Sequence, residues 1–379
     1  MKNVAFIIES LNLGGAETSL VTLLNNIDYS KYSVDLILFT KQNYFINYLP
    51  KEVNVVYVDF PDLNIIERIK FKFSKIYNKK KQHPAQILWP LIYSRFNLFE
   101  KKYDLAHAYN QGFATYYAAN FINAKAKFAW INIDYQKAQY NIQYDYVQYA
   151  QFNKIIAISD EVKRGFEEEL QKVNCNYNIE IIKLFTDENL LKKRSEEPLP
   201  LVFDINKINI VTTCRLSKQK GLHLVIESCN KLIKNGHSVH WYIVGEGNQR
   251  IFLEGLIKKY KLQNHITLVG ATKNPFPYMK ACDIYVQTSL FEGWGLTVIE
   301  AVLLNKLVVT TNFPTAYNII KDGITGLICE MNSNEITRNI ERFILEKDLI
   351  EKIKINLSNR KNTDKLESLA KLELLNNFL

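Results

Sequence analysis

Short apolar runs bounded by polar residues recur along this sequence, and most are followed by helical periodicity. The first run, Val4–Ile8, precedes the glycine pair Gly14-Gly15 and a segment with apolar residues at helical spacing up to Ile27. A strand, a glycine turn, a helix and another strand make a βαβ unit, and its repetition predicts a parallel sheet with helices on both faces. The other strands predicted in this series are 33–39, 53–60, 104–109, 126–133, 154–160 and 178–185.

A second series of the same kind follows a charged, proline-containing segment, which we interpret as a linker over 186–207. We expect an N-terminal domain over 1–185, a C-terminal domain over 208–355, and a final helix over 356–379 that packs back on the N-terminal domain. Two doubly wound, Rossmann-like α/β domains that face each other would form a central cleft at the carboxyl ends of both sheets, where such sheets bind ligands. The strands predicted in the second series are 207–217, 239–248, 265–270, 282–289, 307–312 and 325–330.

Composition agrees with a globular protein of two domains. The chain has 379 residues, of which 47% are hydrophobic and 23% charged, and this length exceeds what one ordinary core accommodates. The formal net charge of +9 favours anionic partners such as nucleotides, phosphates, acidic lipids or nucleic acid. A lysine-rich surface that only keeps the chain in solution is an equally good explanation of the charge alone.

The cysteines and the apolar runs indicate a cytoplasmic location. Five cysteines are scattered without any C-x-x-C pair, so we expect neither a disulfide framework nor a structural zinc site. The apolar run that ends at Glu9 is too short for a signal peptide. No run approaches the ~18 residues of a membrane span, so any contact with a membrane should be peripheral.

The stretch FEGWGLTVIE, from Phe291 to Glu300, contains two glutamates on either side of two glycines. One interpretation is structural: Thr297 and Glu300 would form a capping box at the start of a helix. The other is functional: the glycines leave the first amides of the helix open as an anion site. In that case Glu292 would accept hydrogen bonds from sugar hydroxyls, and Glu300 from a ribose diol.

Three further motifs could complete such a site. Arg215 and Lys220, in RLSKQKG, follow a predicted strand and could pair with a diphosphate, although a solvated basic loop is the more common role of such a turn. Gly245 and Gly247, in VGEGNQR, form a G-x-G turn without the third glycine of a dinucleotide-binding fingerprint. The Gly14-Gly15 pair would allow the backbone to approach a phosphate closely, or would only be a strand-to-helix turn.

These motifs together resemble those of family-four glycosyltransferases, which have the GT-B fold. The order is GGAE, RLSxxKG, VGEGxxR and E-x7-E, and it spans nearly the whole chain. The segments YDLAHAYNQGF and AWINIDY resemble an N-domain pattern of bacterial cell-surface polysaccharide transferases. The resemblance implies a retaining transfer of a hexose from a nucleotide-diphosphate sugar, usually without a metal and most often from a UDP-sugar.

The resemblance also implies roles for individual residues. Arg215 and Lys220 would neutralise the diphosphate, Glu292 would hold the donor sugar and Glu300 the ribose. Asn132, Asp134 and Gln111 would lie on the acceptor side, with Asn132 where related proteins usually have a histidine. Further donor-binding positions, mostly through the main chain, would be Gly14, Gly15, Gly245, Gly247, Ala271, Gly293, Trp294, Gly295, Leu296 and Thr297.

The chemistry of the leaving group agrees with this assignment. Departure of a nucleoside diphosphate develops negative charge, which either a divalent metal or fixed cations and dipoles must stabilise. The sequence contains no D-x-D triplet and no His/Asp cluster at ligand spacing, so we expect no metal and no other cofactor. In the mechanism usual for the family, the departing phosphate oxygen takes the acceptor proton during attack on the same face.

A basic amphipathic stretch precedes the middle of the N-terminal domain. Apolar positions Ile66, Ile69, Phe73 and Ile76 could share one helical face, and a single acid, Glu67, stands against seven cations: Arg68, Lys70, Lys72, Lys75, Lys79, Lys80 and Lys81. A solvated helix packed on the sheet and a helix docked to anionic lipid explain the pattern equally well. Docking would suit a lipid-linked acceptor.

The sequence therefore predicts a cytoplasmic glycosyltransferase of surface polysaccharide synthesis (capsule or lipopolysaccharide), located at the inner face of the membrane. Its partners would be a nucleotide sugar and a glycan or lipid-linked acceptor, with no nucleic acid. The alternatives are a nucleotide-sugar epimerase of similar architecture, an NAD-dependent oxidoreductase, which the missing third glycine disfavours, and a basic nucleic-acid-binding protein, for which the sequence offers no known module.

Overall fold

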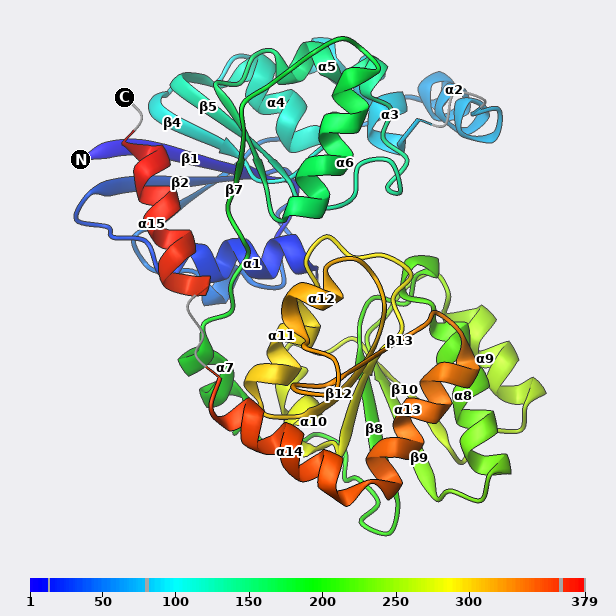
Figure 1. The fold of residues 1–379 in the computed structure, drawn as a ribbon. Helices are drawn as coiled ribbons and strands as arrows, with labels where there is room; N and C mark the ends of the chain where they lie inside the picture. Colours follow the sequence, from blue (N-terminus) through cyan, green and yellow to red (C-terminus); the bar gives the residue numbers. More distant parts are fainter. Residues whose placement is uncertain (13, 79–81, 361–363, 378–379) are drawn as a thin grey trace. The chain divides into compact units, whose positions relative to one another are not determined.

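A computed structural model describes residues 1–12, 14–78, 82–360 and 364–377, and the chain divides into two units. Unit 1 comprises Met1–Phe185 together with Thr363–Leu379, and unit 2 comprises Thr186–Asn362. In each unit, helices flank one fully parallel sheet (Figure 1). The predicted class, α/β with two doubly wound parallel-sheet domains, is confirmed.

Unit 1 contains a seven-stranded sheet in the order β3-β2-β1-β4-β5-β6-β7. Every neighbouring pair in it is parallel. The bounds of its strands are β1 (Lys2–Ile8), β2 (Tyr32–Leu38), β3 (Val53–Tyr57), β4 (Lys102–Ala108), β5 (Asn123–Ile131), β6 (Lys154–Ala157) and β7 (Ile179–Ile181).

The helices of unit 1 include the last helix of the chain. Lys2 Nζ donates to the carbonyl oxygen of Asn376 at 2.8 Å, and Ser368 Oγ donates to that of Lys183 at 2.8 Å. The final helix thus packs on unit 1, although unit 2 precedes it in sequence. The helices are α1 (Gly15–Leu24), η1 (Ile46–Tyr48), α2 (Ile65–Ile76), α3 (Pro84–Ile92), η2 (Tyr93–Arg95), α4 (Phe113–Phe121), α5 (Ile142–Tyr149), α6 (Asp160–Gln171) and α15 (Asp364–Asn376).

Unit 2 contains a six-stranded sheet in the order β10-β9-β8-β11-β12-β13, again with parallel neighbours. Its strands are β8 (Ile208–Thr213), β9 (Val239–Val244), β10 (Ile266–Gly270), β11 (Ile284–Gln287), β12 (Leu307–Thr311) and β13 (Leu327–Cys329). Its helices are α7 (Glu188–Ser195), η3 (Lys218–Lys220), α8 (Leu222–Lys234), α9 (Arg250–Lys259), α10 (Phe276–Ala281), α11 (Leu296–Leu303), α12 (Ala316–Ile319), α13 (Ser333–Leu345) and α14 (Lys347–Ser358).

The segment 186–207, which the sequence predicts to be a linker, contains helix α7. Asp187 caps this helix, because its side chain accepts from the backbone N–H of Leu190. The helix is attached to unit 2: Arg194 Nη2 donates to the carbonyl oxygen of Lys273 at 2.6 Å, and Asn274 Nδ2 donates to that of Arg194 at 2.7 Å. The charged residues and prolines of this segment lie near the start of unit 2, but their pattern did not indicate the short helix α7.

The strand order of each sheet locates the place where a ligand is expected. The order reverses between β1 and β4 in unit 1, and between β8 and β11 in unit 2. At such a switch point neighbouring connections leave toward opposite faces, and the loops at the carboxyl ends of the strands separate. The relevant segments are 9–12 and 109–112 in unit 1, and 214–221 and 288–295 in unit 2.

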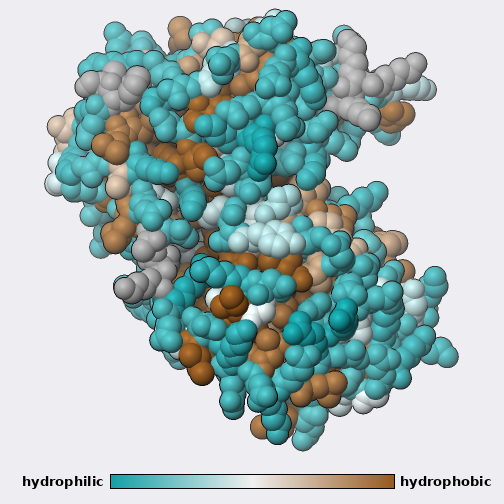
Figure 2. All heavy atoms as spheres, in the orientation of Figure 1, coloured by the Kyte–Doolittle hydropathy of each residue, from teal (hydrophilic) through white to brown (hydrophobic). Residues whose placement is uncertain are grey.

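The core explains why these strands appear in the sequence as continuous apolar runs. Residues Val4–Ile8 are at most 1% exposed, and Trp130 and Trp241 are buried in the two sheets. A parallel sheet covered on both faces needs apolar side chains at successive positions. Hydrophilic residues cover most of the face seen in Figure 2. None of the described helices combines the length and apolar character of a membrane-spanning segment.

Candidate functional site

The two loops at the switch point of unit 2 are bound to each other. The backbone N–H of Leu290 donates to the carbonyl oxygen of Gln219 at 2.8 Å, and Gln219 Nε2 donates to that of Phe291 at 2.9 Å. Thr288 Oγ1 donates to the carbonyl oxygen of Lys220 at 2.8 Å. These bonds fix the position of the η3 turn against the loop after β11, and this places Lys220 beside Glu292.

Lys220 and Glu292 form a largely buried ion pair. Lys220 Nζ lies 2.6 Å from Glu292 Oε1, and the two side chains are 17% and 10% exposed. The same oxygen accepts from Ser289 Oγ at 2.6 Å and from Gln287 Nε2 at 3.2 Å. The other carboxylate oxygen, Oε2, receives no hydrogen bond from the described part of the chain and is available to a hydroxyl of a ligand.

A buried chain of polar groups orients Glu292 from behind. Tyr285 Oη donates to Gln287 Oε1 at 3.0 Å, and Thr213 Oγ1 lies 2.9 Å from the same tyrosine oxygen. Because Gln287 is only 1% exposed, its amide has few alternative positions. Sequence reasoning missed Gln287 and Ser289. The available signal was the polar triplet Gln-Thr-Ser at the carboxyl end of an apolar strand at the switch point.

Arg215 lies on the loop after β8, at the same edge of the sheet. Its side chain is exposed and has no hydrogen-bond partner within the described ranges. The preceding residue, Cys214, lies close to the ion pair: burial raises the pKa of its thiol to about 12, with smaller effects of Lys220 and Glu292 in opposite directions. A guanidinium without a protein partner is free to bind an anion bidentately.

The G-x-G turn allows this loop to pack against the loop after β9. The backbone N–H of Leu216 donates to the carbonyl oxygen of Glu246 at 2.9 Å. Gly245 has a φ of +144°, and a Cβ there would lie 1.9 Å from the carbonyl oxygen of Cys214. At Gly247 a Cβ would lie 2.4 Å from the carbonyl oxygen of Leu216. Both glycines are thus required by contact between the two loops, which holds the Arg215 loop in place.

Helix α11 begins beside the ion pair, and its N-terminus is open. Gly295 is the N-cap, with a φ of +85° in the left-handed region, and no side chain caps the helix. Thr297 lies inside the helix, and its Oγ1 donates to Gln287 Oε1 at 3.4 Å. The capping-box interpretation of Thr297 and Glu300 is therefore wrong. The first amides of the helix, at Leu296 and Thr297, remain available to an anion.

Glu300 lies one turn inside α11 and is 6% exposed. Burial raises the pKa of its carboxyl group to about 8, and the positive charge of Arg194 opposes this effect. The described structure contains no hydrogen bond to this carboxyl group. A buried acid without a local structural partner is consistent with the predicted contact to a ribose diol.

The raised pKa of Glu300 predicts how stability depends on pH. The folded-state pKa of about 8 lies above the value of about 4.3 expected in the unfolded chain, so the folded state binds more protons between these values. The free energy of unfolding should therefore fall as pH rises through this window, by up to about 1.4 kcal/mol per pH unit. In Glu300→Gln this contribution should be absent, as measured by urea unfolding from about pH 5 to about pH 8.

Glu254→Gln is the matched control for this measurement, because the Glu254 side chain is 52% exposed and pairs with Arg250 on the surface of α9. Its unfolding free energy should follow the pH dependence of the original protein. Identical pH dependence in Glu300→Gln and in the original protein would show that Glu300 does not titrate in this range.

The remaining donor-side positions fall on both units. Ala271 is exposed directly after β10, while Gly293 and Trp294 are buried. In unit 1, Gly14 is the N-cap of α1 and Gly15 its first residue, again without a side-chain cap. On unit 2, by contrast, the predicted residues after β8 and β11 lie at one edge: Arg215, Lys220, Glu292, Gly295 and Thr297.

Two of the three predicted acceptor-side residues are in contact in unit 1. The backbone N–H of Asn132 donates to Gln111 Oε1 at 3.1 Å, and Asn132 Nδ2 donates to the carbonyl oxygen of Tyr109 at 2.5 Å. Asn132 Oδ1 and Gln111 Nε2 are buried without a hydrogen-bond partner in the described structure. Asp134 has a local role, since its Oδ1 accepts from the backbone N–H of Lys137 at 2.9 Å.

Glu9, which the sequence predictions omitted, lies at the switch point of unit 1. Its Oε1 accepts from the backbone N–H of Ala114 at 3.2 Å, in the first turn of α4, and its Oε2 accepts from Asn110 Nδ2 at 3.2 Å. Burial raises the pKa of this carboxyl group, and these hydrogen bonds oppose the change. An acidic residue that ends an apolar strand was the signal for it.

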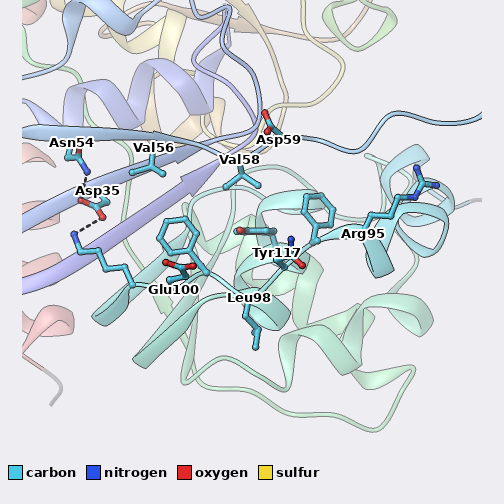
Figure 3. A pocket seen from close by; sticks show the side chains of 13 residues that line it. Asp35, Asn54, Val56, Val58, Asp59, Arg95, Leu98, Glu100 and Tyr117 are labelled. Atoms are coloured by element: carbon cyan, nitrogen blue, oxygen red, sulfur yellow. Dashed lines mark hydrogen bonds and ion pairs between the residues drawn. The ribbon is translucent and has the colours of Figure 1, made fainter.

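A hollow of about 790 Å³ in unit 1 contains none of the predicted site residues. It lies beside β2 and β3 (Figure 3), and its buried acid, Asp35, accepts from Lys101 Nζ at 2.7 Å and from Asn54 Nδ2 at 3.1 Å. Tyr103 Oη also donates to Asp35, at 2.6 Å. Because this carboxylate is fully paired within the protein, we assign the hollow no role in binding the donor.

The described residues also bear on metal binding. No group of three or more His, Cys, Asp or Glu side chains within them is placed to hold a metal ion.

Comparison with known proteins identifies the second half of the chain. Residues 194–360 match the family described as glycosyl transferases group 1. The chain carries a group 1 glycosyltransferase domain. This domain contains Arg215, Lys220, Glu292 and Glu300, and the match confirms the family that the motifs predict. It does not favour the epimerase, oxidoreductase or nucleic-acid-binding alternatives.

Curated relatives agree with this assignment. A capsular polysaccharide biosynthesis glycosyltransferase of Staphylococcus aureus, CapM, is 27% identical over 52% of this chain and 54% of its own length. A Campylobacter jejuni transferase, N-acetylgalactosamine-N,N'-diacetylbacillosaminyl-diphospho-undecaprenol 4-alpha-N-acetylgalactosaminyltransferase, is 31% identical over 38% of this chain and 39% of its own length. The chain thus spans between about a quarter and about half of the length of the curated relatives it matches.

The crystal structure of HepE from Anabaena in complex with UDP and glucose matches over 100% of both chains, with a TM-score of 0.72 and 17% identity. At this identity the likeness shows the fold alone. The GT-B fold predicted alongside the group 1 family is confirmed.

Proposed function

We propose that this protein is a retaining glycosyltransferase that moves a hexose from a UDP-sugar to a glycan or lipid-linked acceptor in surface polysaccharide synthesis. The observation that carries the proposal is the Lys220–Glu292 pair beside the open N-terminus of α11, inside a group 1 domain. A cation, a carboxylate with a free oxygen and unpaired amides are the groups that a sugar diphosphate requires.

In the proposed reaction, unit 2 holds the donor and stabilises the leaving group. The bond between the anomeric carbon and the β-phosphate oxygen breaks, and negative charge collects on the diphosphate. Arg215, Lys220 and the first amides of α11 would neutralise it, in a partly desolvated site where such interactions are strong. We propose that no metal ion is needed for this step.

Glu292 would position the sugar in this scheme. Its free Oε2 is available to accept from a sugar hydroxyl, while Oε1 is held by three donors. The acceptor oxygen then attacks the anomeric carbon on the face that the diphosphate leaves. Its proton passes to the departing phosphate oxygen, so no protein nucleophile is required and the anomeric configuration is retained.

Unit 1 would bind the acceptor. The amides of Gln111 and Asn132 lie together at the carboxyl edge of its sheet, and each leaves one buried polar atom unpaired. Buried polar atoms normally have partners, so these two atoms are suited to hydroxyls of a sugar acceptor. The named substrate of the Campylobacter relative is lipid-linked, and we propose the same kind of acceptor here, at the inner face of the cytoplasmic membrane.

The choice of nucleotide is directly testable by thermal unfolding. UDP at about 100 times its Kd should stabilise the protein by about 2.7 kcal/mol, with NAD and oligonucleotides inactive. A panel of nucleotide sugars, assayed for slow release of free nucleotide, should then identify the donor. Stabilisation by NAD with no response to UDP or GDP would refute the proposed function.

A further inference from the structure

Helix α2 is attached to unit 1 by one narrow side. Asn64 and Glu67 form a capping box at its start, and Arg95 pairs with Glu67 and donates through Nη1 to the carbonyl oxygen of Asp62 at 2.5 Å. Glu67 and Phe71 are the only half-buried residues in the helix, and none is buried. Figure 1 shows α2 at the outer edge of the unit, beyond α3.

Apart from Phe71, the apolar residues of α2 face the solvent, which is the reverse of an ordinary surface helix. At 3.6 residues per turn they occupy an arc of about 120°, and the half-buried pair Glu67 and Phe71 lies opposite its centre. An amphipathic helix that belonged only to the fold would direct this arc inward. The exposed residues of the arc, with their exposures, are Ile65 (77%), Ile66 (65%), Ile69 (50%), Phe73 (57%), Ile76 (66%) and, directly after the helix, Tyr77 (69%).

Positive charge borders the apolar arc on both sides. On the helical wheel Lys72 lies next to one edge of the arc and Lys70 next to the other, with Arg68 and Lys75 further round. Glu67 is the one acid of the helix, and it is already paired with Arg95. Lys79, Lys80 and Lys81, which the sequence analysis included in this stretch, lie outside the described residues.

The exposed apolar arc and the flanking cations together fit one kind of binding partner. A second copy of the chain would bring two positively charged helices together, which like-charge repulsion disfavours. A nucleic acid would use the cations but leave six exposed apolar side chains without a partner. An anionic bilayer matches both features, because acyl chains accept the apolar arc and lipid phosphates pair with the flanking lysines.

We propose that α2 is a membrane-docking helix that lies in the interface of an anionic lipid bilayer, with its apolar arc directed toward the acyl chains. The proposal rests on the proposed function only for its purpose, which is to hold unit 1 near a lipid-linked acceptor. The exposed apolar residues of α2 and the positive charge beside them support the docking proposal whatever reaction the protein catalyses.

Co-sedimentation of the full chain with vesicles tests the docking helix. The protein should bind vesicles of phosphatidylcholine mixed with phosphatidylglycerol much more strongly than vesicles of phosphatidylcholine alone, and salt should weaken this binding. Lys70→Gln with Lys72→Gln should weaken binding to the anionic vesicles about 25-fold, since each cation contributes about fivefold. Ile69→Asp with Phe73→Asp should abolish it.

The chain offers matched controls for both pairs of substitutions. Ile251 and Phe252 on α9 are 85% and 51% exposed, and Lys352 and Lys354 are exposed on α14. Ile251→Asp with Phe252→Asp, and Lys352→Gln with Lys354→Gln, should leave vesicle binding unchanged. Every variant should keep its stabilisation by UDP, so that loss of docking is distinguished from failure of the proposed reaction or from unfolding.

Three outcomes would overturn the docking proposal. The first is equal binding to neutral and anionic vesicles. The second is vesicle binding that survives both α2 double variants. The third is a lipid-independent dimer in sedimentation velocity that Ile69→Asp with Phe73→Asp dissociates, without any binding to vesicles, because it would assign the apolar arc to a second copy of the chain.

Discussion

Glu292→Gln should lower the rate of sugar transfer about 100- to 1,000-fold, the range seen when a preorganised polar group is removed from an active site. The substitution preserves the shape of the side chain, so Oε1 can still accept from Ser289 and Gln287. It removes the negative charge that we propose orients the donor sugar. Affinity for UDP should be retained or increased, because Lys220 loses its carboxylate partner and becomes free for the phosphates.

A lower transfer rate without a loss of UDP affinity distinguishes a role of Glu292 in orienting the sugar from a purely structural role. Transfer rate, UDP affinity by calorimetry and thermal stability should be measured on the same preparation. Glu254→Gln on α9 is the matched control and should behave as the original protein in all three. Transfer and donor hydrolysis at the original rate in Glu292→Gln would remove Glu292 from the site.

Arg215→Ala should weaken UDP binding about 10- to 100-fold, because hydrogen bonds to charged groups contribute about 1.5–3 kcal/mol. Uridine, which lacks the diphosphate, should bind the variant and the original protein equally. Stability should change little, since the Arg215 side chain is exposed and has no protein partner among the described residues. Calorimetric titration with both ligands measures the difference.

Lys218→Ala is the control for Arg215, because Lys218 is an exposed cation in the same connection between β8 and α8. It tests whether general positive charge, rather than the placement of Arg215, attracts the diphosphate. Equal losses of UDP affinity in the two variants, or an equal loss of uridine affinity in Arg215→Ala, would contradict the assignment.

Most of the fold could be predicted because parallel strands covered on both faces need continuous apolar runs. Each of the described strands overlaps a run identified in the sequence, from Val4–Ile8 onward. Helix α7 was missed because charged residues and prolines resemble a linker, and its attachment depends on contacts of Arg194 and Asn274 with residues distant in sequence.

The site could be predicted only as far as its motifs extended. Lys220 and Glu292 were identified from local patterns, and the strand order brings them together. The groups behind them, Gln287 and Tyr285, were missed because a polar residue in a strand does not show which neighbour it will contact. The start of α11 was ambiguous for a related reason: Thr297 and Glu300 have capping-box spacing, but Gly295 in a left-handed conformation caps the helix two residues before Thr297.

The orientation of α2 illustrates a different limit. Helical periodicity shows that one face is apolar, but not whether that face turns toward the sheet or toward the solvent. The decision depends on the contact between Arg95 and Glu67, which holds the side opposite the apolar arc against unit 1. Neither residue is distinctive in the sequence.

A crystal structure of the UDP complex, grown in the presence of EDTA, tests the central claim most directly. The diphosphate should lie against the Arg215 guanidinium, the Lys220 ammonium group and the first amides of α11, with Glu292 Oε2 directed toward the position of the sugar. Phosphates bound away from these groups, or UDP that binds only when a divalent ion bridges it to carboxylates, would contradict the account.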